Sequence, residues 1–176
     1  YAKCGDLTKA RDVFDQLCGR NDISWNAMIV GYAQNGRAKE AVALFDEMLS
    51  QGFFANEVTF TNLLYACSHA GLVEEALRFF NSMEAECYRL KPTPEHYACI
   101  IDLLGRVGRL SDAEGIVKRS PGGGDPVMWV SLLGACRVHG DLDRARRAAD
   151  EIFRLDPQRA EPYVLMANIS AASQET

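Results

Sequence analysis

Three histidines, His69, His96 and His139, carry the side chains in this sequence best suited to holding a metal ion or moving a proton. They fall in separate stretches of the chain. The sequence has no His-x-Glu run followed by Pro-Cys-x-x-Cys, the signature with which zinc deaminases activate water. It also has no His-Glu-x-x-His run and no Gly-x-Ser-x-Gly nucleophile elbow. We therefore expect no catalytic site and no cofactor, and we expect the histidines at the surface or at hairpin ends.

The cysteines do not suggest a metal site either. None is paired as Cys-x-x-Cys, and no histidine stands at ligand spacing from two of them. Free cysteine is commonly buried as a small apolar residue. We expect buried free thiols in a reducing compartment at Cys4, Cys18, Cys67, Cys87, Cys99 and Cys136.

A repeat organises the chain. An aromatic residue stands eleven positions before a glycine in the pairs Trp25 and Gly36, Phe60 and Gly71, Tyr97 and Gly108, and Trp129 and Gly140. Five residues after each glycine comes an alanine: Ala41, Ala76, Ala113 and Ala145. Gly5 with Ala10 marks an earlier partial unit, and Tyr163 has the spacing to begin another, in which Gln174 replaces the glycine.

Each landmark predicts an element. Apolar residues at helical spacing run from the aromatic to the glycine, which can end a helix in the left-handed conformation. A second amphipathic helix follows, in which the alanine allows close approach of the two helices. Phe14, Phe45 and Phe80 each follow their alanine by four residues and should fill the groove. Hairpins must stack to bury both helices, so we predict an all-α protein, an α-solenoid of antiparallel helix-turn-helix repeats of about 31–37 residues.

The net charge of the chain limits the classes of molecule that it is expected to bind. The net charge of −5 argues against a strongly basic protein that binds nucleic acid by neutralising phosphates. It leaves room for a reader of bases, and it also suits protein–protein contact. No apolar run reaches the ~18 residues of a membrane span, so we expect no membrane segment. Both ends read like the middle of a unit, and we expect the chain to be part of a longer protein.

Two runs carry a family resemblance. The sequences WNAMIVGYAQNG at residues 25–36 and EAVALFDEM at residues 40–48 resemble the pentatricopeptide repeat family of plants. The varying unit lengths are similar to the PLS subclass, which alternates short, standard and long repeats. The run EHYACIIDLLGRVGRL at residues 95–110 looks like the last short repeat of that subclass, and WVSLLGACRVHG at residues 129–140 looks like its C-terminal E-type extension.

The resemblance implies a division of the chain and a function. It implies a partial repeat at residues 1–21, repeats at 22–56, 57–93 and 94–125, and a truncated extension of TPR-like helical hairpins at 126–176. Such proteins bind single-stranded RNA in the mitochondrion or plastid, one base per repeat, and most with this extension direct C-to-U editing. The extension would then recruit accessory editing proteins or a DYW-type deaminase.

The resemblance also implies which residues read bases. In this family one reader directly follows the aromatic of the first helix, and the other is the last residue of the repeat. An apolar residue three places before the first reader packs against the base. In the first complete repeat the readers are Asn26 and Asn56, a pair that favours pyrimidines, with Ile23 packing. Asn21 would be the closing reader of the incomplete unit before it.

The reading positions of the family match the residues of the next two repeats less completely. In the second, the readers are Thr61 and Thr93, with Val58 packing. In the third they are Ala98 and Asp125, with Glu95 at the packing position. Since Glu95 and Ala98 depart from the usual residue types, this repeat could instead hold the strand or connect modules.

Several alternatives stay open. Asn26 and Asn56 could be helix-cap or turn residues. Trp25 and Trp129 could stack on bases, although their place in the repeat favours the core between helices. A face with Arg144, Arg147 and Arg154 is either solvated and balanced by nearby Asp143, Asp150 and Glu151, or a docking face for RNA phosphate or a protein. For the chain as a whole, the rival function is a protein-interaction scaffold that binds no RNA.

Overall fold

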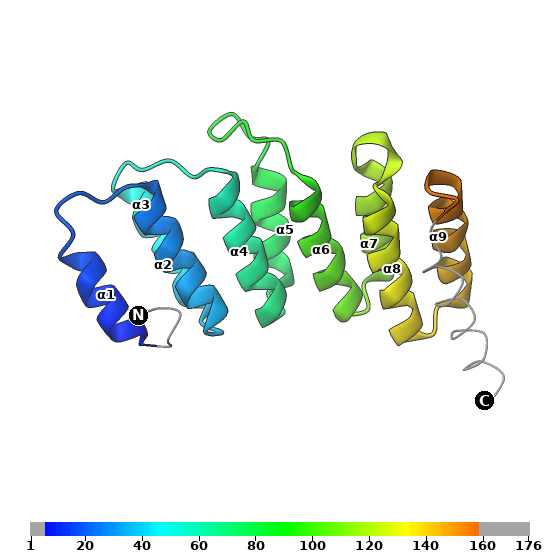
Figure 1. Cartoon of the computed structure of the whole chain (residues 1–176), viewed down its shortest axis with the longest axis horizontal. Helices are drawn as coiled ribbons and strands as arrows, with labels where there is room; N and C mark the ends of the chain where they lie inside the picture. The colour runs from blue at the N-terminus through cyan, green and yellow to red at the C-terminus, as the bar shows by residue number, and fades with distance from the viewer. Residues whose placement is uncertain (1–5, 159–176) are drawn as a thin grey trace. The chain divides into compact units, whose positions relative to one another are not determined.

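The computed structural model describes residues 6–158, and within them every regular element is helical (Figure 1). The predicted all-α class is confirmed. The elements are α1 (Leu7–Asp15), α2 (Asp22–Gln34), α3 (Ala38–Ser50), α4 (Glu57–Ala70), α5 (Val73–Ser82), α6 (Pro94–Arg106), α7 (Leu110–Arg119), the 3₁₀ turn η2 (Pro121–Gly123), α8 (Pro126–His139) and α9 (Leu142–Leu155). Helices α2, α4, α6 and α8 begin where the four expected units begin.

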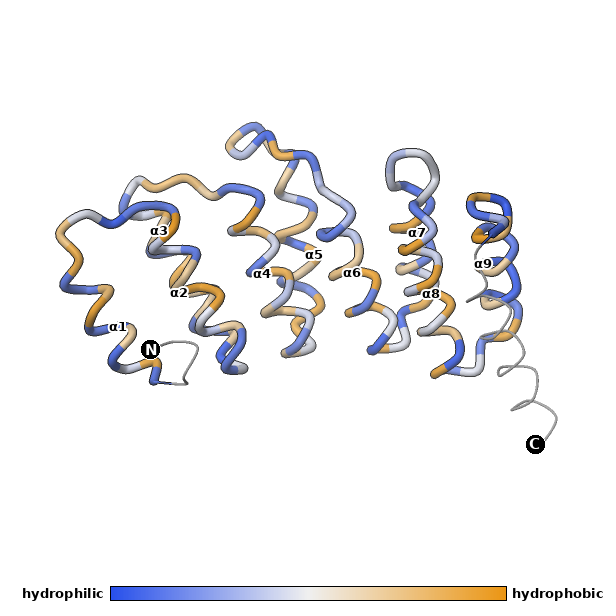
Figure 2. The backbone as a smooth tube through the Cα atoms, in the orientation of Figure 1, coloured by the Kyte–Doolittle hydropathy of each residue, from blue (hydrophilic) through white to orange (hydrophobic). Residues whose placement is uncertain are grey.

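The chain forms two compact units, Tyr1–His96 and Tyr97–Thr176. In the first unit, α2 pairs with α3 and α4 with α5 as antiparallel hairpins, and α2 also packs along α4. Apolar and polar segments alternate along each helix, as expected of helices with one buried face (Figure 2). The hairpins stack as the repeat predicts.

The landmark residues have the predicted roles. Gly71 and Gly140 end α4 and α8 in the left-handed conformation, with φ of 69° and 68°. The four landmark alanines are fully buried, and Phe14, Phe45 and Phe80 are buried. Phe45 makes edge-to-face contacts with Phe60 at 6.0 Å and Phe79 at 5.4 Å between ring centroids. Aromatic pairs of this geometry stabilise by about 0.5–1.5 kcal/mol beyond the area that they bury.

Both tryptophans belong to the core. Trp25 is fully buried and meets Phe14 edge to face at 4.7 Å. Trp129 is also buried, and its indole nitrogen donates to the carbonyl oxygen of Gly123 over 3.1 Å. The prediction that they fill the space between helices, rather than stack on bases, is confirmed.

In the second unit, α8 packs against both α7 and α9. Glu114 of α7 is buried and accepts hydrogen bonds from Lys118 at 2.7 Å, Arg144 at 2.7 Å and Arg147 at 3.3 Å. Arg144 also pairs with Asp141. Among the expected counter-charges, Glu151 forms an ion pair with Arg154, and Asp143 adds an electrostatic attraction to Arg147. Glu114, which was not expected in this role, pairs with both Arg144 and Arg147.

Two expectations were wrong. His96 is fully buried rather than at the surface, because its ring nitrogens have protein hydrogen-bond partners. Cys18 and Cys87 are exposed, since both lie in connections between helices. Cys67 and Cys136 are buried as expected, and burial raises the pKa of each thiol to about 11.

Some expectations fall on residues outside the described range. They are Cys4 and Gly5 of the partial repeat and the unit proposed to begin at Tyr163 with Gln174 in the glycine position. Within residues 6–158, no group of three or more acidic, histidine or cysteine side chains could hold a metal ion. No helix of that range is long and apolar enough to cross a membrane.

Candidate nucleic-acid interface

The first predicted reader pair sits where α2 and α4 meet. Asn26 lies one residue beyond the buried Trp25, so its side chain emerges at the edge of the core and is 8% exposed. Asn56 immediately precedes α4. The Nδ2 atom of Asn26 donates to Oδ1 of Asn56 over 3.3 Å. The fold therefore brings together two side chains that stand thirty residues apart.

Asn56 also caps α4. Its Oδ1 accepts from the backbone nitrogen of Thr59, and the Thr59 hydroxyl accepts from the backbone nitrogen of Asn56, each over 3.1 Å. Such reciprocal caps satisfy amide groups that a helix start leaves unpaired. Asn21 caps α2 in the same way with Ser24, at 3.0 Å in both directions. The alternative of a helix cap thus holds for Asn56 but not for Asn26, which lies inside α2. The cap uses only the side-chain oxygen of Asn56.

Two side-chain amide atoms of the pair have no hydrogen-bond partner among the described residues. Nδ2 of Asn56 has no acceptor among the described residues, and Oδ1 of Asn26 is buried without a donor. Because a buried polar atom without a partner costs roughly 1–3 kcal/mol, such an atom calls for an explanation. Through the Nδ2 atom of Asn56, the pair can offer hydrogen-bond donors to the polar edge of a ligand.

A pocket of about 430 Å³ surrounds this pair. Its apolar flanks include Ile23 and Val58, which are 77% and 56% exposed. Exposed β-branched side chains beside paired amides suit a planar ring with a polar edge, because the ring face can pack while the edge forms hydrogen bonds. The three residues predicted for this site, Asn26, Asn56 and Ile23, line one pocket. Val58, predicted as the packing residue of the second repeat, lines the same pocket, as does Asn62, for which the sequence carries no signal.

The second predicted pair is joined through a third residue. Thr61 and Thr93 are both partly exposed, and His96 lies between them. One ring nitrogen of His96 is 3.0 Å from the Thr61 hydroxyl, and the other is 2.9 Å from the backbone nitrogen of Thr93. The Thr93 hydroxyl donates to Glu95 over 2.6 Å, and this hydrogen bond lowers the pKa of the Glu95 carboxyl.

The third predicted pair has no comparable contact. The methyl side chain of Ala98 has neither donor nor acceptor. Asp125 caps α8, accepting from the backbone nitrogen of Val127 over 2.8 Å. Glu95, at the packing position, is exposed and bonded to Thr93. The side chains of this repeat thus offer less to a base than those of the first.

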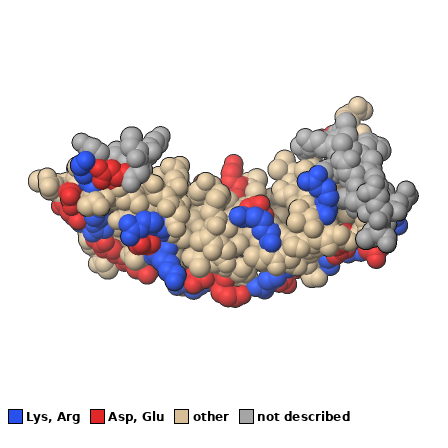
Figure 3. Space-filling model, turned by 90° about the horizontal axis from the view of Figure 1, so that it is seen from below, with Lys and Arg blue, Asp and Glu red and all other residues tan. Residues whose placement is uncertain are grey.

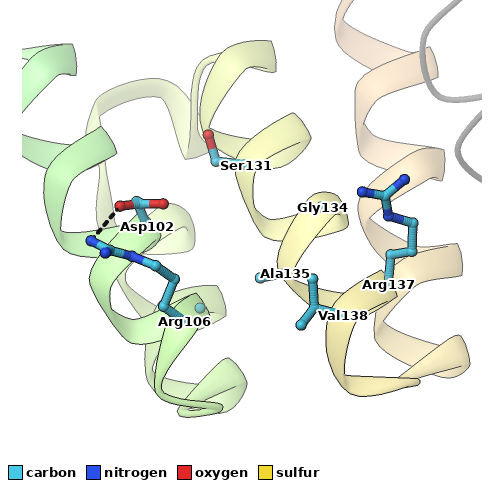
Figure 4. Close-up of a pocket in the computed structure, with 8 residues that line it drawn as sticks. Asp102, Arg106, Ser131, Gly134, Ala135, Arg137 and Val138 are labelled. Atoms are coloured by element: carbon cyan, nitrogen blue, oxygen red, sulfur yellow. Dashed lines mark hydrogen bonds and ion pairs between the residues drawn. The ribbon is translucent and has the colours of Figure 1, made fainter. Parts of the chain in front are cut away.

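A second pocket, of about 350 Å³, lies in the second unit between α6 and α8 (Figure 4). Small residues of α8 form one wall, and Arg106 pairs with Asp102 at 2.8 Å on the other. The Ser131 hydroxyl donates to the carbonyl oxygen of Val127 within its own helix. No sequence pattern predicts this pocket.

The surface charge is mixed. On the face in Figure 3, acidic and basic side chains are interspersed rather than gathered by sign. Together with the net charge of −5, this distribution favours recognition through base edges and ring faces over phosphate neutralisation.

Comparison with known proteins identifies the repeat. The profile of the PPR repeat family matches residues 20–69, and that of the PPR repeat matches residues 1–21 and 58–88. Together they cover residues 1–88, half of the chain. The chain belongs to the PPR repeat family.

Plant relatives extend the similarity to nearly the whole chain. The chloroplastic pentatricopeptide repeat-containing protein DOT4 of Arabidopsis thaliana is 46% identical over 99% of this chain and 20% of its own length. The mitochondrial protein At3g53360 of the same plant is 44% identical over 98% of this chain and 22% of its own length. The chain thus spans about a fifth of the length of these relatives.

Solved PPR structures share the fold. The crystal structure of PPR10 from maize is 25% identical, with a TM-score of 0.74 over 96% of this chain and 25% of that one. The PPR domain of protein-only RNase P 1 from Arabidopsis thaliana, solved in complex with tRNA, is 16% identical, with a TM-score of 0.76 over 97% of this chain and 93% of that one. At 16% identity, the similarity to the RNase P domain shows a shared fold and nothing more.

Proposed function

We propose that this chain binds single-stranded RNA through its PPR repeats, with Asn26 and Asn56 reading one base. The observation that carries the proposal is their direct contact inside a pocket flanked by Ile23 and Val58. An unpaired strand presents both ring faces and base edges, which this pocket can accept. PPR10 was crystallised with an 18-nt psaJ RNA element, which supports RNA as the ligand class.

The amide chemistry is compatible with the pyrimidine preference that the family resemblance implies. The Oδ1 atom of Asn56 already accepts from Thr59 and Asn26, so the pair presents mainly N–H donors to the pocket. Both pyrimidines carry a carbonyl oxygen at C2 that can accept such a donor. Thr61 with Thr93, Ala98 with Asp125, and Asn21 are proposed as further readers on the resemblance.

The experiment is an affinity measurement with single-stranded RNA on the double variant Asn26→Ala with Asn56→Ser. Serine keeps a capping oxygen before α4, so the fold should survive. Loss of two or more hydrogen bonds should weaken binding by about tenfold or more. Equal binding by the double variant would refute the assignment of this pair.

We further propose that the whole protein acts in an organelle as a C-to-U editing factor. Residues 1–125 would supply RNA specificity, and residues 126–176, the E-type extension, would bind an accessory editing protein or a DYW-type deaminase. Relatives named chloroplastic and mitochondrial support an organellar place of action. The proposal assigns no catalytic step and no cofactor to this chain.

The test is sequencing of organellar transcripts from a plant that lacks the protein. Loss of editing at a few defined cytidines is the expected result. Normal editing with altered cleavage or abundance of one transcript would point to another kind of RNA processing. The rival function, a protein scaffold, has the net charge of −5 in its favour and predicts no affinity for RNA.

A further inference from the structure

His96 occupies a capping position that is shared by three repeats. The third residue after Asn21, Asn56 and Thr93 is Ser24, Thr59 and His96, respectively. In each repeat, the side chain of this third residue accepts a hydrogen bond from the backbone nitrogen three positions earlier. The pairs are Ser24 with Asn21 at 3.0 Å, Thr59 with Asn56 at 3.1 Å and His96 with Thr93 at 2.9 Å. His96 therefore caps α6 as a hydroxyl does in the other two repeats.

Unlike a hydroxyl, the imidazole extends to the preceding repeat. Its Nε2 atom lies 3.0 Å from Oγ1 of Thr61 and 3.1 Å from the carbonyl oxygen of Glu57. A backbone N–H can only donate, so Nδ1 must accept from Thr93. The neutral ring then carries its hydrogen on Nε2, which donates toward Thr61 and Glu57.

This arrangement fixes the hydrogen-bonding sense of Thr61 and uses the hydrogen of Thr93 within the protein. A hydroxyl has one hydrogen and two lone pairs. The hydrogen of Thr61 goes to the carbonyl oxygen of Glu57 over 3.0 Å. The Thr93 hydroxyl lies 2.6 Å from the Glu95 carboxylate and 2.8 Å from Nδ1 of His96, and both of these atoms are acceptors for its hydrogen. Both hydroxyls are left with lone pairs to offer, whereas the first repeat offers amide N–H groups.

We propose that His96 is a third member of the reading set of the second repeat. It is a positioning residue that holds Thr61 as a hydrogen-bond acceptor toward the base. The inference deepens the proposed RNA-binding function and rests on it. Two acceptors match guanine best, because its N1–H and N2–H₂ groups place adjacent donors on one edge. The second repeat should therefore prefer guanine, through a histidine that does not itself touch the base.

The tautomer can be tested without RNA. Nitrogen NMR of the protein should show the His96 ring protonated at Nε2 and accepting at Nδ1, with a signal that changes in the Thr61→Val variant. A ring protonated at Nδ1 would overturn the inference and leave the proposed function intact.

The effect on selectivity needs a matched pair of variants. In His96→Asn, the side-chain oxygen can still accept from Thr93 but the donor to Thr61 is lost. In His96→Gln, the longer amide can reach Thr61. Ser24→Ala removes the corresponding cap of α2 and controls for lost capping alone. Circular dichroism should confirm that each variant folds.

The probe is a set of single-stranded RNAs that differ only at the nucleotide facing the second repeat. That nucleotide adjoins the one whose preference depends on Asn56. We expect His96→Asn to reduce the preference for guanine over the other bases by roughly three- to tenfold, the effect of about one hydrogen bond, while His96→Gln and Ser24→Ala retain it.

Three outcomes would overturn the inference. The first is an unchanged base preference in His96→Asn. The second is an equal loss of affinity for every RNA, which would mean a structural role alone. The third is a further loss of the preference for guanine when His96→Asn is introduced into the Thr61→Val variant. That comparison is also the informative one if His96→Asn alone folds poorly. Absence of RNA binding by the unaltered protein would instead refute the proposed function on which the inference rests.

Discussion

The side-chain nitrogen of Asn26 donates to the side-chain oxygen of Asn56, 3.3 Å away and thirty residues later in the chain. The contact ties the first helix of one repeat to the first helix of the next. It also explains how one residue can cap a helix and still contribute to a ligand pocket, since the cap uses the oxygen of Asn56 and leaves hydrogens on its nitrogen.

The apolar flank of the pocket gives the first prediction. Ile23→Ser should weaken binding of single-stranded RNA by about three- to tenfold, because apolar packing against one ring face is lost. Stability should change by less than about 0.5 kcal/mol, since the side chain is 77% exposed. Phe54→Ser is the control: Phe54 is 80% exposed but does not line the pocket, and its loss should leave affinity unchanged.

Close helix approach in the second unit gives a prediction about stability. A Cβ atom on Gly105 would lie 2.6 Å from that of Ala135, too close without moving α6 away from α8. Gly105→Ala should therefore destabilise the protein in urea by roughly 1–2 kcal/mol despite the better helix propensity of alanine. Gly115→Ala, in α7 with open space around it, should be neutral or stabilising. Equal effects of the two variants would contradict this explanation.

The buried carboxylate of Glu114 predicts a dependence on pH. Burial raises its pKa, but hydrogen bonds from Lys118, Arg147 and Arg144 outweigh burial and hold the pKa at about 2, below the usual 4.5. Its contribution to stability is therefore complete above pH 4.5 and is lost as the pH falls toward 2.

Glu114→Gln should accordingly destabilise the protein by roughly 1–3 kcal/mol at pH 7, and the difference from the unaltered protein should shrink between pH 4.5 and 2. Urea denaturation at several pH values measures both effects. Glu151→Gln, which removes an exposed pair with Arg154, should cost well under 1 kcal/mol. If the difference in stability between Glu114→Gln and the unaltered protein stayed constant down to pH 2, the ionised carboxylate would be ruled out as its cause.

The sequence was sufficient to predict the hairpins because their determinants are local. Glycine at a helix end, alanine where helices meet and aromatics at fixed spacing each act within one unit, and the landmark glycines at 36, 71, 108 and 140 all have positive φ. The burial of Trp25 and Trp129 followed from the same spacing.

Contacts between units were harder to predict. His96 was expected at the surface because its partners, Thr61 and Glu57, lie 35 and 39 residues away and periodicity does not pair them. The pocket between α6 and α8 depends on the small residues of α8 facing α6. The pairing of Asn26 with Asn56 was expected from the family resemblance, and local helix rules alone predict only the cap.

The central claim, that the Asn26–Asn56 pair reads one base, is tested most directly by selecting RNA from a randomised single-stranded pool with the unaltered protein and with Asn56→Asp. The carboxylate keeps the capping oxygen before α4 but removes the N–H donors of residue 56 and adds a charge. We predict that the preference shifts, at one nucleotide only, toward a base whose edge places an N–H donor opposite the new carboxylate. An unchanged profile, or a loss of preference spread over all positions, would contradict the claim.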